Sequence, residues 1–193
     1  MTVGFDLETP RLRLERLSDH HLEDLVALDA DPRVMRFING GQPTSRREYE
    51  DAIMGRIKAW DDKPFGFAAA YHFERFIGWF HLRPTVASYP AALGLVLELG
   101  YRLRHEAWGR GLATEGGRAL VHYAFHRLGV ACVDGCAHPD NVASRRVLEK
   151  CGMNHVGQFE HPRAPLEVVH YEVRRDAPRR SDADVGSSRS TST

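Results

Sequence analysis

The stretch Leu93–Arg127 reads LGLVLELGYRLRHEAWGRGLATEGGRALVHYAFHR, and the rest of the chain is interpreted outward from it. Its first third carries an apolar residue at every second position, namely Leu93, Leu95, Leu97, Leu99, Tyr101 and Leu103. A period of two predicts a strand over 93–103 with one strongly apolar face. In the last third the apolar residues follow a helical period, which predicts an amphipathic helix over Thr114–Leu128 that Gly129 can end.

A glycine-rich turn, Trp108-Gly-Arg-Gly-Leu-Ala113, joins this strand to this helix. Free backbone N–H groups and the positive end of the helix converge there, which predicts an anion site, with a plain tight turn as the alternative. The Walker pattern is absent, and Thr114 stands where a dinucleotide fingerprint needs Gly or Ala. We therefore expect a phosphate site of another kind.

A second block, HPDNVASRRVLEKCGM, occupies residues 138–153. Asp140 or Asn141 can cap a helix there, and Gly152 stands where a glycine ends one. The apolar stripe of this helix consists of Val142, Val147, Leu148 and Cys151.

Together the two blocks resemble the central strand, pyrophosphate loop and coenzyme A helix of the GNAT superfamily of acetyl-CoA-dependent N-acetyltransferases. The closest resemblance is to its Rim-type group, the ribosomal-protein N-terminal acetyltransferases and their relatives. The superfamily loop runs Gln/Arg-x-x-Gly-x-Gly/Ala, so Gly111 and Ala113 match. Trp108 departs at the first position, where Trp is usual in the Rim-type group. The resemblance covers about residues 9–173.

The element order predicted along the chain is β-α-α-β-β-β-α-β-α-β-β, a mixed α/β sheet. Strands are expected at 11–17, 65–73, 76–82, 93–103, 130–137, 155–159 and 166–174, and helices after Ser18, after the Ser45–Glu48 capping box, over 114–128 and after Asn141. The resemblance implies the GNAT fold, whose fourth and fifth strands splay apart to admit the pantetheine arm. We expect one domain over residues 1–175 and a disordered polar tail over 176–193.

Charge and cysteine content narrow the class of protein. Lys plus Arg and Asp plus Glu each number 26, so no net field favours nucleic acid or anionic lipid. No apolar run is long enough for a bilayer and Met1–Pro10 lacks the features of a signal peptide, so we expect a soluble, cytoplasmic protein. The three cysteines, Cys132, Cys136 and Cys151, lack zinc spacing and are expected to be buried free thiols.

The resemblance implies that an amine attacks the thioester of acetyl-CoA directly. For the cofactor it implies pyrophosphate binding by the backbone of Arg110, Gly111, Leu112, Ala113 and Thr114, strand-like pairing of the pantetheine arm with Leu99, Gly100 and Tyr101, and a contact from Asn141.

For proton transfer we expect Glu98 to act as the general base and, by resemblance, Ser144 to protonate the departing thiolate. Alternatives stay open: Glu98 can instead pair with Arg102 on the same strand face, Ser144 can be an exposed helix serine, and His138 can serve as the base.

Other chemistry is disfavoured. His122 and His126 lie four apart on a polar helix stripe with no further ligand, so no metal is expected, and Cys136 has no partner base. The acceptor is left open between a protein N-terminus and a small amine, although the loops 33–45 and 83–92 hold no carboxylates, which disfavours polycations. A non-catalytic acyl-CoA-binding module is the alternative function, and a homodimer is a possible assembly.

Overall fold

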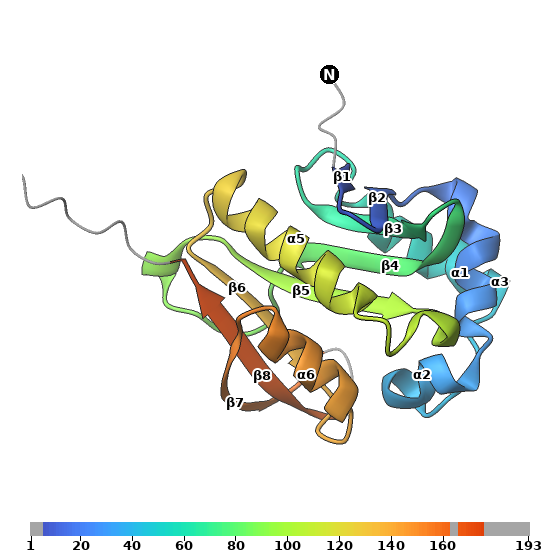
Figure 1. The fold of residues 1–193 in the computed structure, drawn as a ribbon. Helices are drawn as coiled ribbons and strands as arrows, with labels where there is room; N and C mark the ends of the chain where they lie inside the picture. Colours follow the sequence, from blue (N-terminus) through green and yellow to red (C-terminus); the bar gives the residue numbers. More distant parts are fainter. Residues whose placement is uncertain (1–5, 163–165, 176–193) are drawn as a thin grey trace, which may run out of the picture.

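A mixed sheet runs through the molecule in the order β1-β2-β3-β4-β5-β6-β8-β7 (Figure 1). This computed structural model describes residues 6–162 and 166–175. Its strands are β1 (Leu7–Glu8), β2 (Leu12–Arg16), β3 (Gly66–His72), β4 (Arg75–Pro84), β5 (Val96–Leu103), β6 (Cys132–Ala137), β7 (Asn154–Glu160) and β8 (Glu167–Arg174). Its helices are α1 (Leu22–Asp29), α2 (Pro32–Asn39), α3 (Arg46–Glu48), α4 (Met54–Lys58), α5 (Leu112–His126) and α6 (Val142–Lys150).

The predicted mixed α/β class is confirmed, and the expected element order holds with β1 and α2 added. All neighbouring strands are antiparallel except β5 and β6, which are parallel. Among the described helices, none is long and apolar enough to cross a membrane. The tail predicted over 176–193 lies outside the described residues.

Helices cover both faces of the sheet, so the sheet separates two apolar cores. On one face, Leu97 and Leu99 of β5 pack in a core with Leu112 and Leu120 of α5. On the other face, α1, α2 and α4 pack against β3 and β4 around a second core that includes Leu25. The face of β5 that carries Glu98 and Arg102 is therefore covered by these helices and is not exposed to solvent.

The segment after α1 forms a helix that the sequence left unassigned. Asp31 caps α2 by accepting the backbone N–H of Arg33 at 2.9 Å, Pro32 takes the first helical position, and Gly40 ends the helix at φ +77°. The predicted Ser45–Glu48 capping box is confirmed at the start of α3. From there α3, a π-helical turn over Tyr49–Ile53 and α4 follow without a break.

The predicted starts of β5 and α5 were wrong by a few residues. Leu93 lies in a 3-10 turn and Gly94 has φ +64°, which ends extended structure, so β5 begins at Val96 and Leu95 is exposed. Gly111, at φ +77°, is the residue before α5, which begins at Leu112 rather than Thr114.

Strands β5 and β6 separate after a short paired stretch. They pair only from Val96 to Glu98 of β5, opposite Cys132 to Asp134 of β6. Beyond Glu98, β5 stays paired with β4 as far as Leu103, and β6 stays paired with β8. The splay that the resemblance implied is therefore present, with one open edge of β5 lining it.

Candidate active site

The open edge of β5 presents backbone groups from alternate residues. Thr85 donates its N–H to the Val96 carbonyl and Arg104 donates to Ile77, so even-numbered residues here bond toward β4. Odd-numbered residues, Leu99 and Tyr101 among them, thus direct their N–H and carbonyl groups at the gap beside β6. An added Cβ at Gly135 of β6 would lie 3.2 Å from the Leu99 carbonyl oxygen, which agrees with this direction. Leu99 and Tyr101 are therefore the backbone positions that can pair with an extended ligand in the gap.

Gly100 has a different task in this strand. It lies opposite His81 of β4, and a Cβ there would come within 2.4 Å of the His81 ring. The absence of a side chain at Gly100 makes room for the imidazole. Gly100 therefore shapes the side-chain layer on the opposite face more directly than it shapes the gap.

Beyond the C-terminal end of β5, the glycine turn leads into the N-terminus of α5, where the sequence predicts an anion site. The backbone N–H groups of the first turn, Leu112, Ala113 and Thr114, have no carbonyl partner within the helix, because the first such bond runs from Glu115 to Gly111. The turn is held from outside: Arg11 donates to the Arg110 carbonyl at 2.9 Å and pairs with the Glu115 carboxylate. A fixed turn with free donors suits a phosphate group.

The expected acid, Ser144, meets β5 across the gap. Its hydroxyl lies 2.9 Å from the Tyr101 hydroxyl, which also donates to the Ser144 carbonyl at 3.2 Å. Burial raises the pKa of Tyr101, so this phenol keeps its proton. Asn141 caps α6, and its Oδ1 accepts the Ser144 N–H at 3.1 Å. The structure thus brings Ser144, Tyr101 and Asn141 together at one side of the gap.

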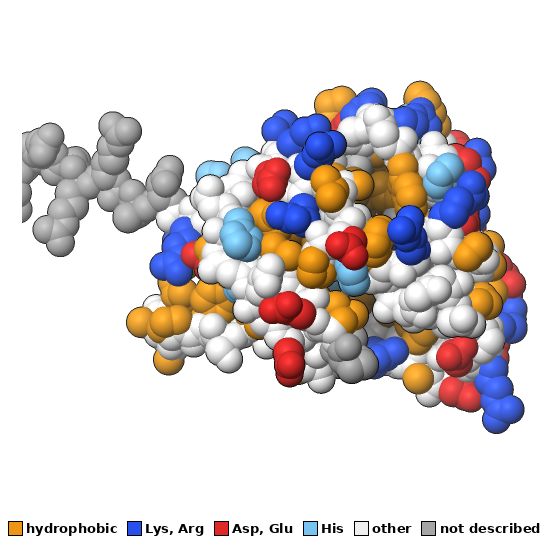
Figure 2. Space-filling view, turned by 90° about the horizontal axis from the view of Figure 1, so that it is seen from below, with side chains coloured by type: hydrophobic (Ala, Val, Ile, Leu, Met, Phe, Trp, Pro, Cys, Tyr) orange, Lys and Arg blue, Asp and Glu red, His pale blue; other side chains and the backbone are white. Residues whose placement is uncertain are grey.

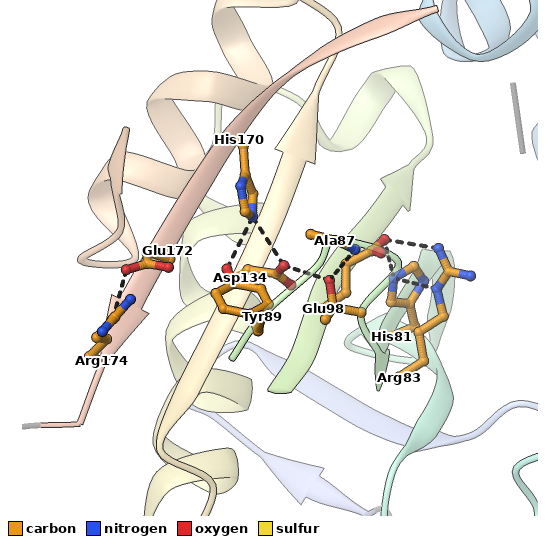
Figure 3. A network of polar contacts seen from close by, with 10 residues as sticks. His81, Arg83, Ala87, Tyr89, Glu98, Asp134, His170, Glu172 and Arg174 are labelled. Atoms are coloured by element: carbon orange, nitrogen blue, oxygen red, sulfur yellow. Dashed lines mark hydrogen bonds and ion pairs between the residues drawn. The ribbon is translucent and has the colours of Figure 1, made fainter. Parts of the chain in front are cut away.

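The Glu98 carboxylate is buried on the other face of β5, in contact with two side chains of β4. Its Oε1 accepts from Arg83 Nη2 at 2.9 Å and lies 3.3 Å from His81 Nε2 (Figure 3). The alternative that paired Glu98 with Arg102 is wrong, because cross-strand neighbours lie closer than residues four apart on one strand; Arg102 pairs with Asp29 instead.

Burial alone would raise the pKa of Glu98, but the contacts with His81 and Arg83 lower it to about 2. Burial lowers the pKa of His81, against the attraction of Glu98. At neutral pH the pair is therefore a carboxylate beside a neutral imidazole. His81 Nε2 lies 3.3 Å from Glu98 Oε1, which can only accept, and also 3.3 Å from Arg83 Nε, which can only donate, so these contacts do not by themselves assign the ring proton to one nitrogen. Nδ1 has no hydrogen-bond partner among the described residues.

A second buried carboxylate, Asp134 of β6, lies opposite Glu98 at the last paired position. It accepts from the Thr85 hydroxyl at 2.5 Å and lies 3.1 Å from His170 Nε2, which also contacts the Tyr89 hydroxyl. Figure 3 shows Glu98 and Asp134 between His81 and Arg83 on one side and His170 on the other. These contacts attach the loop after β4 to the sheet and hold the end of the paired stretch in place.

A cavity of about 510 Å³ lies between the sheet and helices α1, α2 and α4. Its walls are largely aromatic and aliphatic, and its lining includes Tyr49, Trp60, Phe67, Trp79, His81 and Arg83. This volume is in the range of sites for small ligands. The face seen in Figure 2 is hollowed, with hydrophobic side chains in the hollow and Lys and Arg side chains beside it.

The remaining candidates have structural tasks. The His138 ring packs against Phe37 at 5.2 Å, and its Nδ1 accepts the Asp140 N–H, so it fixes the turn before α6. His122 and His126 contact each other, and no cluster of metal-binding type occurs among the described residues. All three thiols are free: Cys132 and Cys151 are buried as expected and Cys136 is partly exposed. Burial raises the pKa of Cys136 to about 12, which opposes a nucleophilic role.

His81 and Arg83 were not among the site residues predicted from the sequence. The strand period could have indicated them. Trp79, His81 and Arg83 occupy alternate positions of the second hairpin strand, so their side chains share one face of the sheet. Only the pairing of β4 with β5 shows that this face meets Glu98.

The comparisons with known proteins agree with this geometry. An acetyltransferase (GNAT) domain model matches residues 11–154. The chain is 34% identical over 173 residues to the FsC-acetyl coenzyme A-N(2)-transacetylase of Aspergillus fumigatus, covering 87% of this chain and 74% of that relative. It is 28% identical over 159 residues to the uncharacterized N-acetyltransferase YoaA of Bacillus subtilis, covering 78% and 84%.

A solved structure of RimL, a ribosomal L7/L12 alpha-N-protein acetyltransferase in complex with coenzyme A, has the same fold. Its TM-score is 0.72 at 18% identity, with 88% of this chain and 97% of that chain covered. The chain therefore belongs to the GNAT acetyltransferase family and is an acetyl-CoA-dependent N-acetyltransferase.

Proposed function

We propose that this enzyme acetylates a small primary amine that enters the cavity beside His81, while acetyl-CoA lies in the gap between β5 and β6. The first turn of α5 binds the pyrophosphate through Leu112, Ala113 and Thr114, with Arg110 and Gly111 completing the turn. Leu99 and Tyr101 pair with the pantetheine arm, which Asn141 meets from α6. The observation that carries the proposal is the position of His81, which lines the cavity and faces the stretch of β5 whose other edge is open.

In this proposal His81, rather than Glu98, accepts the proton from the attacking ammonium. A carboxylate whose pKa is about 2 is a weak base, and its Oε1 is already bound by Arg83 and His81. The neutral imidazole has an unpartnered Nδ1 in the cavity wall. We assign the ring proton to Nε2, which donates to Glu98 Oε1, so that Nδ1 takes the proton of the substrate and Glu98 stabilises the imidazolium that forms.

On the gap side, the proposal assigns protonation of the departing thiolate to Ser144 and to the Tyr101 hydroxyl bonded to it. Burial keeps Tyr101 protonated, and either hydroxyl can be the donor in their mutual bond. A proton given up by one can therefore be replaced through the other.

A small-molecule acceptor is supported by the cavity, whose volume of about 510 Å³ is in the range of sites for small ligands. The fungal relative is named an FsC-acetyl coenzyme A-N(2)-transacetylase. RimL, whose name records a protein acceptor, is similar in fold at 18% identity. We further infer a cytoplasmic location, because three free thiols fit a reducing compartment.

The test is thiol release from acetyl-CoA across a panel of primary amines, with coenzyme A affinity measured separately. His81→Gln should lower kcat by at least about 10²-fold and leave coenzyme A affinity unchanged. His72→Gln is the matched control, because His72 lies on β3 of the same sheet and is not part of the cavity wall. Wild-type activity in His81→Gln would contradict the base assignment, and coenzyme A binding without release for any amine would indicate a non-catalytic module.

A further inference from the structure

One guanidinium of the cavity wall has no acidic partner. Three arginines line the cavity, and two of them are paired with buried carboxylates. Arg83 pairs with Glu98 at 2.9 Å, and Arg102 pairs with Asp29. The third, Arg56 of α4, forms no hydrogen bond or ion pair with any residue that the structure describes. A cationic side chain that lines a cavity without a counter-charge can bind an anionic group of a ligand.

The sequence around Arg56 explains why it stays unpaired. Side chains on a helix pair with residues three or four positions away, and for Arg56 these positions hold no acidic residue: they are Ala52, Ile53, Ala59 and Trp60. The other basic residues of this helical segment all have acidic partners. Arg46 pairs with Glu50 and Arg47 with Asp51, each four positions on, and Lys58 pairs with Asp19. Over residues 46–58, Arg56 is thus the basic side chain left for a ligand.

Burial shows that Arg56 lies where the cavity opens to solvent. The exposed members of the lining come from α2 and α4, and they are Ile38, Asn39, Arg56 and Ala59. They mark the mouth. His81 is buried and belongs to the inner wall. An acceptor whose amine reaches His81 therefore directs its other end toward the mouth and Arg56.

Apolar rings line the cavity together with these two polar groups. Trp79 stacks on the His81 ring, with centroids 5.7 Å apart and an angle of 19° between the planes, and Phe67 packs against Trp79 at 5.6 Å. Trp60 follows Arg56 by one helical turn and also lines the cavity. Phe67, Trp79 and Trp60 are all partly exposed, so their rings offer apolar surface to a ligand.

The charges of the wall favour an acceptor that carries its own anion. The carboxylates of Asp29 and Glu98 offset Arg102 and Arg83, so the positive charge of Arg56 is left over. This charge repels an ammonium group that enters alone, and a carboxylate on the same molecule removes the repulsion. One excess positive charge matches a monoanion, and the guanidinium fork matches the two oxygens of a carboxylate.

We propose that Arg56 binds a carboxylate of the acceptor substrate at the mouth of the cavity. The substrate class is thus a primary amine joined through an apolar spacer to a carboxylate, an amino acid in the broad sense. Arg56 is in this role a specificity residue that contacts the substrate and takes no part in proton transfer. The inference rests on the proposed function, because the amine is the group that is acetylated beside His81.

The probes are ω-amino carboxylic acids of increasing spacer length, the matching primary carboxamides, which have the same shape without the charge, and the matching α,ω-diamines. Thiol release from acetyl-CoA measures kcat/KM for each. At the spacer length that fits, the wild-type enzyme should prefer the acid to the amide by about tenfold, the value of one hydrogen bond to a charged group at a partly exposed site. The diamine should be the poorest of the three.

Two variants test the residue itself. In Arg56→Gln the preference for the acid should fall to about one, and in Arg56→Glu the diamine should become better than the acid. Because Arg56 is exposed, neither change removes a side chain from the core. Arg47→Gln is the matched control, since Arg47 is an exposed arginine of the same helical segment that is not part of the cavity wall. It should keep the wild-type preference.

Three results would overturn the proposal. One is equal use of acid and amide by the wild type at every spacer length. The others are an unchanged preference in Arg56→Gln and a loss in Arg47→Gln as large as that in Arg56→Gln.

The role of Arg56 and the proposed function can fail separately. If no amine releases thiol, the proposed function fails, and calorimetric titration of the same acids and amides in the presence of coenzyme A still measures binding at Arg56. Tighter binding of the acid by about tenfold, lost in Arg56→Gln, would support the carboxylate site, and equal binding of acid and amide would overturn it. If amines release thiol with no preference for the acid, the proposed function stands and the carboxylate site fails.

Discussion

Gly100→Ala is the change that most sharply tests how β5 supports the imidazole. The new Cβ would lie 2.4 Å from Cε1 and 2.5 Å from Nε2 of His81, whereas a normal contact is at least about 3.4 Å. The ring must therefore move by about 1 Å, and its 3.3 Å contact with Glu98 is lost. Misplacement of a catalytic group by this distance costs about 10²-fold in rate, and overpacking costs roughly 1–3 kcal/mol in stability.

The assay separates these effects. We expect kcat to fall by about 10²-fold, and the melting temperature to fall by about 2–4 °C for each kcal/mol of stability lost. The affinity for coenzyme A should change by less than about threefold, because the N–H groups that face the gap belong to the residues on either side of Gly100. Gly55→Ala is the control, since Gly55 lies in α4 where a Cβ meets nothing within 4 Å. Unchanged kcat in a folded Gly100→Ala variant would refute the role of His81 as the base and the claim that Gly100 makes room for its ring.

Three further predictions concern charge, the anion site and the thiols. Because the pKa of Glu98 is lowered to about 2, its charge stabilises the fold above its ordinary pKa near 4.5, and that stabilisation is lost as the pH falls toward 2. The urea midpoint should therefore drop more steeply between pH 4.5 and pH 2 in the wild type than in Glu98→Gln. Parallel curves of midpoint against pH would refute the lowered pKa. Gly111→Asp should weaken coenzyme A binding at least about tenfold in calorimetry, whereas Gly40→Asp, at the same φ of +77° but away from the turn, should not; equal affinities would remove the anion site. At pH 8 the thiols should react with Ellman's reagent about 10²-fold more slowly in the folded than in the unfolded chain. The reason is that burial raises the pKa of Cys132 and Cys151 to about 11 and that of Cys136 to about 12. Labelling of the folded chain as fast as that of the unfolded chain would contradict this prediction.

Predictions that depended on local spacing were confirmed more often than those that depended on partners. The capping box at Ser45 and the helix that Asn141 caps follow from residues three or four apart, which interact whatever the rest of the chain does. The prediction that paired Glu98 with Arg102 was wrong, because strand pairing brings Arg83 beside Glu98 although the two lie 15 residues apart in the sequence. The cofactor and catalytic assignments stay predictions for the experiments above.

The amino-acid sequence by itself determined the mixed α/β class, the glycine turn before α5 and the family, because period, capping and motif spacing are properties of short segments. Only the tertiary structure decided that β5 and β6 part after Glu98, that His81 lies against Gly100, and that Asp29 meets Arg102 inside a cavity. These three facts arise from strand register and from helices covering both faces of the sheet. Register and covering are set by the burial of the whole chain, so no local pattern contains them.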